Sequence, residues 1–401
     1  MIRHAVISGA GIAGPALAHQ LAARGWRTTV LERFPQRRGE GQNVDVRGPA
    51  KEVARRMGVL EAIRAANTGE VGMRFVAEDG SPVASFPMNG PGQIDGPTAE
   101  LEILRGELSR VLIEHSAADV DYRFGATIAD LTDHGEHVTV TLDNETVIDA
   151  DLVVIAEGLR SRTRRFVSDV QVSDLGMYIA YLTIARQDTD DRWWNWQPLT
   201  GSRSVHLRPD NLGTTRAMLT FLSGVRGLEV LDRADQITIL RRTFADAGGA
   251  VPRILAGLDD SAFYFDAVGK FRAPHWSKGR ITLLGDAAFC NATFGGVGTS
   301  MALIGAYVLA GELSGTDDVC TALARYERFM RGYAELAPQV SIKTLRRANP
   351  ATPTGIRVLH AGARLAAGPV GRAATKLFGN RLAHADADDI RLPDYPEMSS
   401  A

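Results

Sequence analysis

Residues 5–32 hold the pattern that most constrains the fold of this chain: an apolar strand, a glycine-rich turn, an alanine- and leucine-rich helix and a second strand. The turn reads Gly9-Ala10-Gly11-Ile12-Ala13-Gly14, and the second strand ends in Glu32. In such a unit the first glycine allows the tight turn, the second lets the backbone approach a pyrophosphate, and the third lets the helix pack on the strand. The pattern predicts an α/β layer that binds the ADP part of a dinucleotide.

Glu32 refines this prediction. It lies near the expected distance of about 20 residues beyond the glycines, where a carboxylate accepts hydrogen bonds from the ribose hydroxyls of NAD or FAD. A carboxylate would repel a ribose 2′-phosphate, so NADP is disfavoured as the ligand of this turn. The alternative is a glycine-rich surface turn, and the flanking apolar strand Ala5–Ile7 and helix Ala16–Ala23 argue against it.

Composition excludes several other classes of protein. The chain has 401 residues, of which 45% are hydrophobic, enough for two interleaved domains with large cores. A formal charge of −2 gives no field that would attract nucleic acid. The two cysteines, Cys290 and Cys320, lack metal-ligand spacing, which indicates no metal site and a cytoplasmic location. No apolar run approaches the ~20 residues of a transmembrane helix, so no membrane partner is expected.

Periodicity along the chain predicts the remaining elements. Residues 49–66 and 100–116 have the apolar spacing of helices. The segment 176–225 is rich in strands and predicts a separate antiparallel sheet. From residue 280 the chain returns to an α/β pattern, with a strand at Arg280–Leu284 and a helix at about 299–313.

Two later motifs indicate which dinucleotide is bound. The first is Ile155-Ala156-Glu157-Gly158, followed by an arginine cluster. The second is Leu284-Gly285-Asp286-Ala287-Ala288, followed by Gly296-Val297-Gly298-Thr299-Ser300. Together with the first turn, they make residues 1–345 resemble the group A flavoprotein monooxygenases, the family of para-hydroxybenzoate hydroxylase and the tetracycline-inactivating monooxygenases. The third motif and the closing Leu392-Pro393-Asp394-Tyr395 are similar to an actinobacterial branch of that family.

The resemblance implies an α/β fold in which a Rossmann-like FAD-binding domain carries an interleaved antiparallel-sheet substrate domain and C-terminal helices. The FAD-binding domain is expected at 1–72, 97–175 and 268–335, and the substrate domain at 73–96 and 176–267. Bracing helices are expected at 336–386 and a loosely held tail at 387–401.

The resemblance also assigns roles to residues. Asp286 would contact the ribityl chain of FAD, and the glycines after it would bring a helix N-terminus to the pyrimidine edge of the isoalloxazine, where its dipole favours negative charge. Arg105 matches an arginine that faces the pyrophosphate or flavin, Asp45 a residue near the flavin, and Arg33 one near the adenosine. The full set of expected FAD-binding residues is Gly9, Gly11, Ile12, Ala13, Gly14, Glu32, Arg33, Asp45, Arg105, Gly158, Asp286, Gly296, Val297, Gly298, Thr299 and Ser300.

Three positions depart from the family's pattern. Glu157 stands where an aspartate is usual, Phe289 where a histidine or tyrosine is usual, and Thr293 where a proline helps to shape the flavin-facing loop. These departures leave open an alternative in which the chain binds FAD but has lost oxygenation and acts as a scaffold or redox-neutral cyclase. A simple NAD dehydrogenase is disfavoured, because Asp286 and the following glycines would then have no ligand.

The implied reaction is hydroxylation of an aromatic or polyketide-like small molecule: NAD(P)H reduces FAD, O2 adds at flavin C4a, and the hydroperoxide transfers one oxygen atom. The cofactor performs this chemistry, and no motif marks a catalytic side chain. Expected substrate contacts are Tyr181, Arg216, Trp196 and His206. For Tyr181, Arg216 and His206 the competing interpretation is an ordinary core or surface role. The cluster Trp193-Trp194-Asn195-Trp196 is similar to a halogenase motif but is one residue too short before Pro198.

Overall fold

Strand β1 (His4–Ser8) is buried along its whole length and lies within a six-stranded sheet. It pairs in parallel with β2 (Arg27–Glu32) and with β11 (Leu152–Ile155). The other strands of this sheet are β17 (Ser277–Lys278), β18 (Ile281–Leu283) and β7 (Val120–Phe124). The computed structural model describes residues 2–39, 41–88, 98–261, 263–292, 296–337, 340–368 and 390–395. The expected parallel α/β layer is confirmed.

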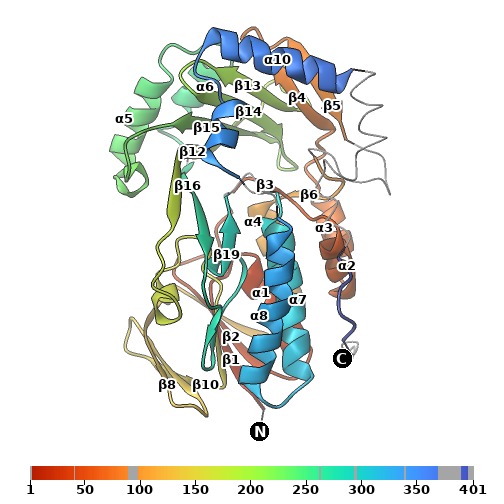
Figure 1. Ribbon diagram of the computed structural model, residues 1–401, viewed down its shortest axis with the longest axis vertical. Helices are drawn as coiled ribbons and strands as arrows, with labels where there is room; N and C mark the ends of the chain where they lie inside the picture. The colour runs from red at the N-terminus through yellow and green to blue at the C-terminus, as the bar shows by residue number, and fades with distance from the viewer. Residues whose placement is uncertain are drawn as a thin grey trace.

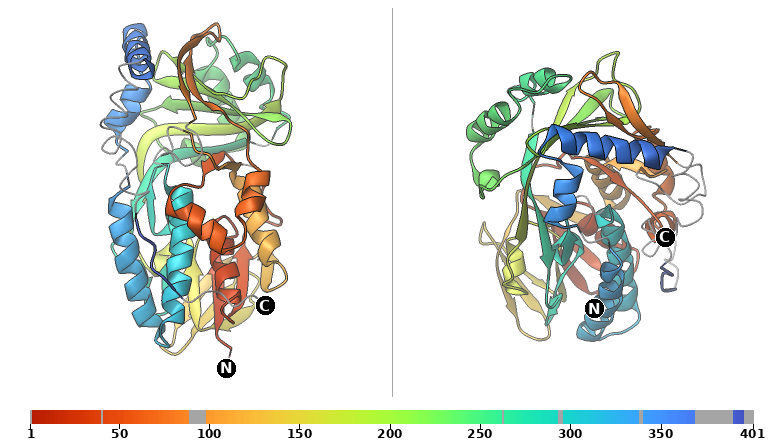
Figure 2. Two further views of the ribbon diagram at one scale, coloured as in Figure 1. Left: turned by 90° about the vertical axis from the view of Figure 1, so that its right-hand side faces the viewer. Right: turned by 45° about the horizontal axis from the view of Figure 1, so that its top comes forward.

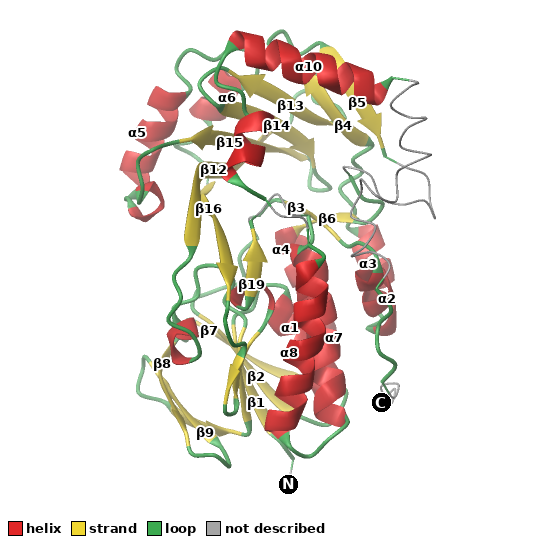
Figure 3. Cartoon of the chain, viewed as in Figure 1, coloured by secondary structure: helices red, strands yellow, loops and turns green. Residues whose placement is uncertain are grey.

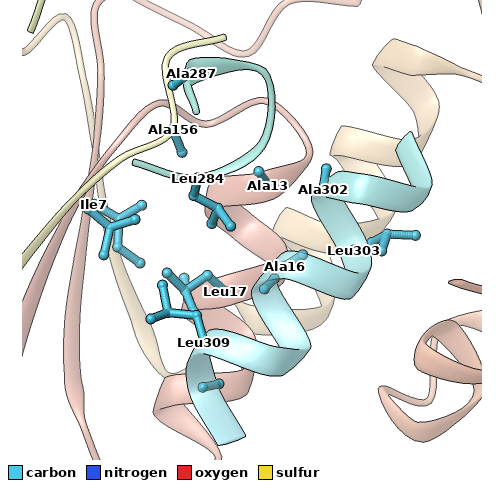
Figure 4. Close-up of a cluster of buried hydrophobic side chains, with 14 of the residues drawn as sticks. Ile7, Ala13, Ala16, Leu17, Ala156, Leu284, Ala287, Ala302, Leu303 and Leu309 are labelled. Carbon is cyan, nitrogen blue, oxygen red and sulfur yellow. The ribbon is translucent and has the colours of Figure 1, made fainter. Parts of the chain in front are cut away.

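Helices α1 (Ala13–Ala22) and α7 (Gly298–Ser314) pack on this sheet. Ile7 of β1, Leu17 of α1 and Leu309 of α7 have no exposed surface and meet in one apolar cluster (Figure 4). Helix α4 (Arg105–Ser116) contacts α1, and helix α8 (Val319–Glu335) contacts α7, next to which it is seen in Figure 3. Because the N-termini of α1 and α7 follow glycine turns, the core fixes where both turns lie.

A second, eight-stranded sheet lies beside the first layer along the long axis of the molecule (Figures 1 and 2). Most neighbouring strands are antiparallel, as expected, but β13 and β4 pair in parallel. In spatial order the strands are β19 (Phe289–Asn291), β16 (Phe263–Arg272), β12 (Ser173–Ala185), β15 (Thr214–Leu222), β14 (Arg203–Pro209), β13 (Trp194–Leu199), β4 (Gly72–Val76) and β5 (Pro82–Pro87).

Helices cover parts of the eight-stranded sheet. Residues of α5 (Arg233–Thr243) and α6 (Val251–Ala256) form a buried cluster with β12, β15 and β16. On other strands, α10 (Pro353–Ala367) lies beside β4 and β5 (Figure 1), and its Ala363 belongs to a buried cluster with residues of these two strands. Helix α9 (Ile342–Ala348) contributes Leu345 to a third cluster beside β12. The domain boundaries drawn from the sequence remain a prediction.

Two small sheets complete the strands: β8 (Ile128–Asp133), β9 (Val138–Leu142) and β10 (Val147–Ala150) form one, and β3 (Asn43–Asp45) with β6 (Glu102–Leu104) forms the other.

The structure differs from the sequence prediction in two segments. The helix expected at 49–66 is divided into α2 (Pro49–Arg56) and α3 (Leu60–Ala65), because Gly58 adopts a φ of 75° between them. Residues 102–104 form strand β6 instead of the first turn of a helix. Of the tail expected at 387–401, the structure describes 390–395, where the Tyr395 hydroxyl donates to Glu312 Oε1 at 2.7 Å and the Tyr395 ring contacts Gly311 of α7.

Candidate active site

A cavity of about 570 Å³ is lined by residues of both the six-stranded layer and the eight-stranded sheet. All three sequence motifs reach it. The expected cofactor residues in its wall are Gly9, Gly11, Ile12, Ala13, Glu32, Arg33, Asp45, Arg105, Gly158, Asp286, Gly296, Val297, Gly298 and Thr299. Gly14 and Ser300 are not in the wall. Gly14 packs against the backbone of Gly9, and Ser300 forms hydrogen bonds with the backbone of Arg47.

The glycine turn between β1 and α1 leaves no room for side chains. Gly9 has a φ of 112°, and a Cβ on it would stand 2.5 Å from the carbonyl oxygen of Ala156. A Cβ on Gly11 would meet the guanidinium of Arg105 at 3.3 Å. Helix α1 has no acidic residue in its first turn. A pyrophosphate at this N-terminus would therefore meet backbone N–H groups and the positive end of the helix dipole.

Glu32 ends β2 at the rim of the turn. Its Oε2 accepts a hydrogen bond from the Ala10 amide at 2.9 Å, and its Oε1 accepts one from the Phe34 amide at 3.1 Å. A carboxylate oxygen has two lone pairs, so each oxygen retains capacity to accept a ribose hydroxyl. The carboxylate thus both ties the turn to the second strand and faces the cavity.

Asp286 lies between β18 and α7, where the third motif bends. Burial raises the pKa of Asp286 above its ordinary value, while the guanidinium charges of Arg105 and Arg164 act in the opposite direction. Arg164 is buried, donates to the carbonyl oxygens of Gly158 at 2.9 Å and Leu159 at 2.6 Å, and stacks on Phe271. The second and third motifs are therefore coupled through charge.

The N-terminus of α7 opens onto the same cavity. Gly296 has a φ of 68°, Val297 is the N-cap, and the first turn of α7 carries no acidic residue. Ser300 is buried and exchanges hydrogen bonds with the backbone of Arg47 at 3.4 Å. Ser300 therefore positions the neighbouring loop, while Gly296–Thr299 face the cavity.

Glu157 does more than replace an aspartate. Its carboxylate accepts hydrogen bonds from the hydroxyls of Ser8 at 2.6 Å, Ser161 at 2.7 Å and Thr163 at 2.5 Å. Burial opposes its ionisation, but these donors outweigh burial and hold the pKa of Glu157 below its ordinary value. The longer side chain thus fastens the second motif to β1. Phe289 is buried on β19 beside Arg272, and Thr293 lies outside the described residues.

Asp45 and Arg47 form an ion pair beside the cavity. Asp45 Oδ2 accepts from Arg47 Nε at 3.0 Å and from Nη2 at 2.7 Å. Asp45 Oδ1 is buried and has no partner among the described residues. One carboxylate oxygen in the cofactor half of the cavity therefore remains available to a donor.

The expected substrate residues divide into two pairs. Tyr181 on β12 and Arg216 on β15 line the cavity, whereas Trp196 and His206 do not. His206 is buried between Trp194 Nε1, at 3.0 Å, and Ser204 Oγ, at 2.8 Å, and burial lowers its pKa to about 3. It is a core histidine, as the competing interpretation predicted. The ring of Trp196 packs on Phe75 and His206.

On β13 and β14, the residues that line the cavity, Trp194 and Arg208, were not among the predicted site residues. Both lie two positions along the strand from the residues that were chosen, Trp196 and His206, and so share their face of the sheet. Arg208 stacks over Trp194 at 4.3 Å. The alternation in residues 205–208 puts His206 and Arg208 on the same face of the strand and does not indicate which of the two lines the cavity. That depends on how far along the strand the cavity extends, and Arg208 is the one in its wall.

Comparisons with known proteins agree with this geometry. Residues 3–317 match the family model described as the FAD binding domain. The chain is 35% identical over 423 residues, covering 97% of each chain, to the flavin-dependent monooxygenase eupH of a Phoma species. The chain belongs to the FAD-binding family of flavin-dependent monooxygenases. It superposes on tetracycline destructases Tet(51) and Tet(55) with TM-scores of 0.79 and 0.78 and identities of 26% and 29%. Each superposition covers 98% of this chain and 99% of the other.

The cofactor of the family is FAD, and the cavity fits it. At Gly9 and Gly11 a Cβ atom would occupy the space that the pyrophosphate needs. Asp286 of the third motif and the N-terminus of α7 line the same cavity.

Among the described residues, no group of three His, Cys, Asp or Glu side chains could hold a metal ion. No helix in the described ranges combines the length and apolar character needed to cross a membrane.

Proposed function

We propose that this enzyme uses NAD(P)H and O2 to hydroxylate an aromatic or polyketide-like small molecule. The observation that carries the proposal is a single cavity that joins the three cofactor motifs to the inner face of the eight-stranded sheet. Bound FAD supplies the hydride acceptance and oxygen activation that side chains cannot. The protein's part is to bind, to orient and to keep the reacting atoms dry.

The cofactor-binding roles are assigned as follows. Gly9, Gly11 and the N-terminus of α1 hold the pyrophosphate, with Arg105 as its cation. Glu32 accepts the adenosine ribose hydroxyls. Asp286 accepts a ribityl hydroxyl, and the N-terminus of α7 stabilises negative charge at the pyrimidine edge of the reduced ring.

The substrate-binding side is assigned to the eight-stranded sheet. Tyr181 lies with its ring 6.4 Å from that of Tyr264, and burial raises its pKa, so its hydroxyl keeps its proton and serves as a hydrogen-bond donor. Ile179, Met218 and Trp194 supply apolar wall around it. This lining favours a planar ring over a strongly hydrated compound.

The proposal is tested with the purified FAD-loaded protein. NADH or NADPH oxidation is followed with a panel of phenolic and polycyclic compounds, and the products are analysed by mass spectrometry for one added oxygen atom. A protein that binds FAD but oxidises neither nucleotide with any compound, and adds no oxygen, would favour the alternative of a scaffold or redox-neutral cyclase.

We also propose a cytoplasmic location and no nucleic-acid partner. Cys290 and Cys320 are both free thiols, and burial raises the pKa of Cys290 well above its usual range, which leaves it as an unreactive filler. The formal charge of −2 adds no attraction for nucleic acid.

A further inference from the structure

The arginines that line the cavity differ in whether they have a carboxylate partner. Those that form no ion pair among the described residues all lie outside the eight-stranded sheet: Arg33, Arg37, Arg38, Arg105 and Arg162. Arg47, beside the cofactor motifs, is paired with Asp45. Arg208 and Arg216 on the sheet, and Arg160 next to it, are all paired. The unpaired group suits a ligand that carries a pyrophosphate, whereas the paired group on the substrate side offers no free cation.

The charge of Arg216, on β15, is neutralised by Asp210 in the turn between β14 and β15. Its Nε donates to Asp210 Oδ2 at 2.9 Å, and its Nη1 donates to Thr183 Oγ1 at 2.5 Å. The carboxylate of Asp210 has no exposed surface and also accepts from the amides of Leu212 and Thr214 at 2.9 Å. Asp210 is therefore fixed, and Arg216 would have to leave a buried partner to bind an anion.

Arg208 is neutralised more fully still. It makes a two-pronged ion pair with Glu70, at 2.8 and 2.9 Å, and a second contact with Glu102. Both carboxylates are 1% exposed. Glu102 Oε1 also accepts from Thr68 and Asn43, each at 2.7 Å. Two buried carboxyl groups thus face one guanidinium, and burial, together with the charge of Glu102, raises the pKa of Glu70 well above its ordinary value.

Arg160 completes the set at the edge next to β16. It donates to Asp174 at 3.0 Å and to Asp266 at 3.1 Å. Three guanidinium groups, those of Arg160, Arg208 and Arg216, are therefore matched by Asp174, Asp266, Glu70, Glu102 and Asp210. No cavity-lining residue of the described parts of β12–β16 offers a cation without a carboxylate partner.

We propose, resting on the proposed function, that the substrate is an uncharged aromatic or polycyclic compound and that carboxylate-bearing analogues are rejected. An anion entering this half would lose its hydration without gaining a free cation and would lie near an excess of carboxylates. An uncharged compound loses little and gains the apolar wall and the Tyr181 hydroxyl. The charge of each arginine is then neutralised by its carboxylate partner, so the arginines offer only hydrogen bonds to a ligand. The carboxylate partners determine that uncharged ligands bind in preference to anions.

The test compares two ligands of matched shape, salicylamide and salicylate, titrated into the FAD-loaded enzyme by calorimetry at neutral pH without NAD(P)H. We expect salicylamide to bind at least about tenfold more tightly, since a buried charge without a partner costs more than that ratio. In Asp210→Asn, which releases Arg216 at nearly constant size, we expect salicylate affinity to rise about tenfold, the scale of one charged hydrogen bond.

Two further variants make the outcome decisive. Asp246→Asn removes the same charge from the Arg203–Asp246 pair, away from the cavity, and should leave the ligand ratio unchanged. Arg216→Gln combined with Asp210→Asn removes the ion pair as a neutral unit and should leave salicylate affinity within about twofold of wild type, because a paired arginine was not binding the carboxylate; this variant decides the matter if Asp210→Asn alone does not fold. Salicylate that binds as tightly as salicylamide, a loss of salicylate binding in the double variant, or no binding of either ligand to any variant overturns the proposal.

These outcomes are distinguishable from failure of the proposed function. Binding is measured as heat in the absence of reductant, so it does not depend on oxygenation. An enzyme that selects salicylamide but hydroxylates no compound would contradict the proposed reaction and retain the charge selection.

Discussion

A Cβ atom on residue 14 would stand 1.9 Å from the carbonyl oxygen of Gly9, so these two glycines hold α1 and β1 in direct backbone contact. Gly9 belongs to the cavity wall, whereas Gly14 lies behind the turn and outside the wall. This difference predicts that the glycines of one motif fail in different ways when they are replaced.

Gly14→Ala should destabilise the fold. The added methyl meets backbone that cannot move alone, and overpacking of this kind costs about 1–3 kcal/mol. Urea unfolding of the apoprotein measures the loss. Gly332→Ala on α8, where the added Cβ meets nothing within 4 Å, is the control and should be neutral or slightly stabilising. Equal stability of Gly14→Ala and wild type would contradict this view of the turn.

Glu32→Gln should weaken FAD binding while preserving the fold. The amide keeps one acceptor oxygen but loses the charge that receives the ribose hydroxyls, a loss of about 1.5–3 kcal/mol. Fluorescence titration of the apoprotein with FAD measures the affinity. Glu61→Gln, on an exposed helix pair with Arg64, is the control. An unchanged FAD affinity in Glu32→Gln would remove the ribose assignment.

Asp286→Asn should also weaken FAD, by about tenfold or more if a ribityl hydroxyl is bound by a charged acceptor. The same substitution should stabilise the apoprotein against unfolding. Burial raises the pKa of the Asp286 carboxyl, and a neutral amide avoids the free-energy cost of burying its charge. Thermal melts without and with FAD separate the two effects. The assignment fails if both the affinity and the melting temperature of the apoprotein stay at their wild-type values.

Acid should destabilise the protein through His206. Burial lowers its pKa from 6.5 to about 3 in the folded state, so between these pH values the unfolded chain binds more protons and stability falls as pH falls. His206→Gln should flatten the decline in melting temperature between about pH 7 and 5. His134→Gln, at an exposed site, should retain the wild-type slope. A His206→Gln slope equal to that of wild type would show that other groups govern the acid response.

Much of the cofactor half could be predicted because its signals are local. The spacing from Gly9 to Glu32 encodes a strand, a turn, a helix and a strand, and the structure has β1, α1 and β2 in those places. The break at Gly58 and strand β6 were missed, since helical periodicity continues through both and only pairing with β3 overrides it at 102–104.

The substrate half could be predicted only in outline. The alternation of Trp194 with Trp196, and of His206 with Arg208, indicates which side chains share a face, but not how far along each strand the cavity extends. That position depends on the parallel pairing of β13 with β4, whose residues are more than a hundred positions apart in the chain. The buried partners Glu70 and Glu102 carry no local signal at all.

The strands of the eight-stranded sheet come from four separated stretches of sequence, near 72–87, 173–222, 263–272 and 289–291, and the chain returns to the other layer between the first and second stretches and again between the third and fourth. Neither layer is therefore a contiguous piece of polypeptide. A cut at any single peptide bond between β5 and β18 would divide both sheets, so the enzyme cannot be shortened to a cofactor module, and exchange of the substrate-binding half between relatives would require several simultaneous joins.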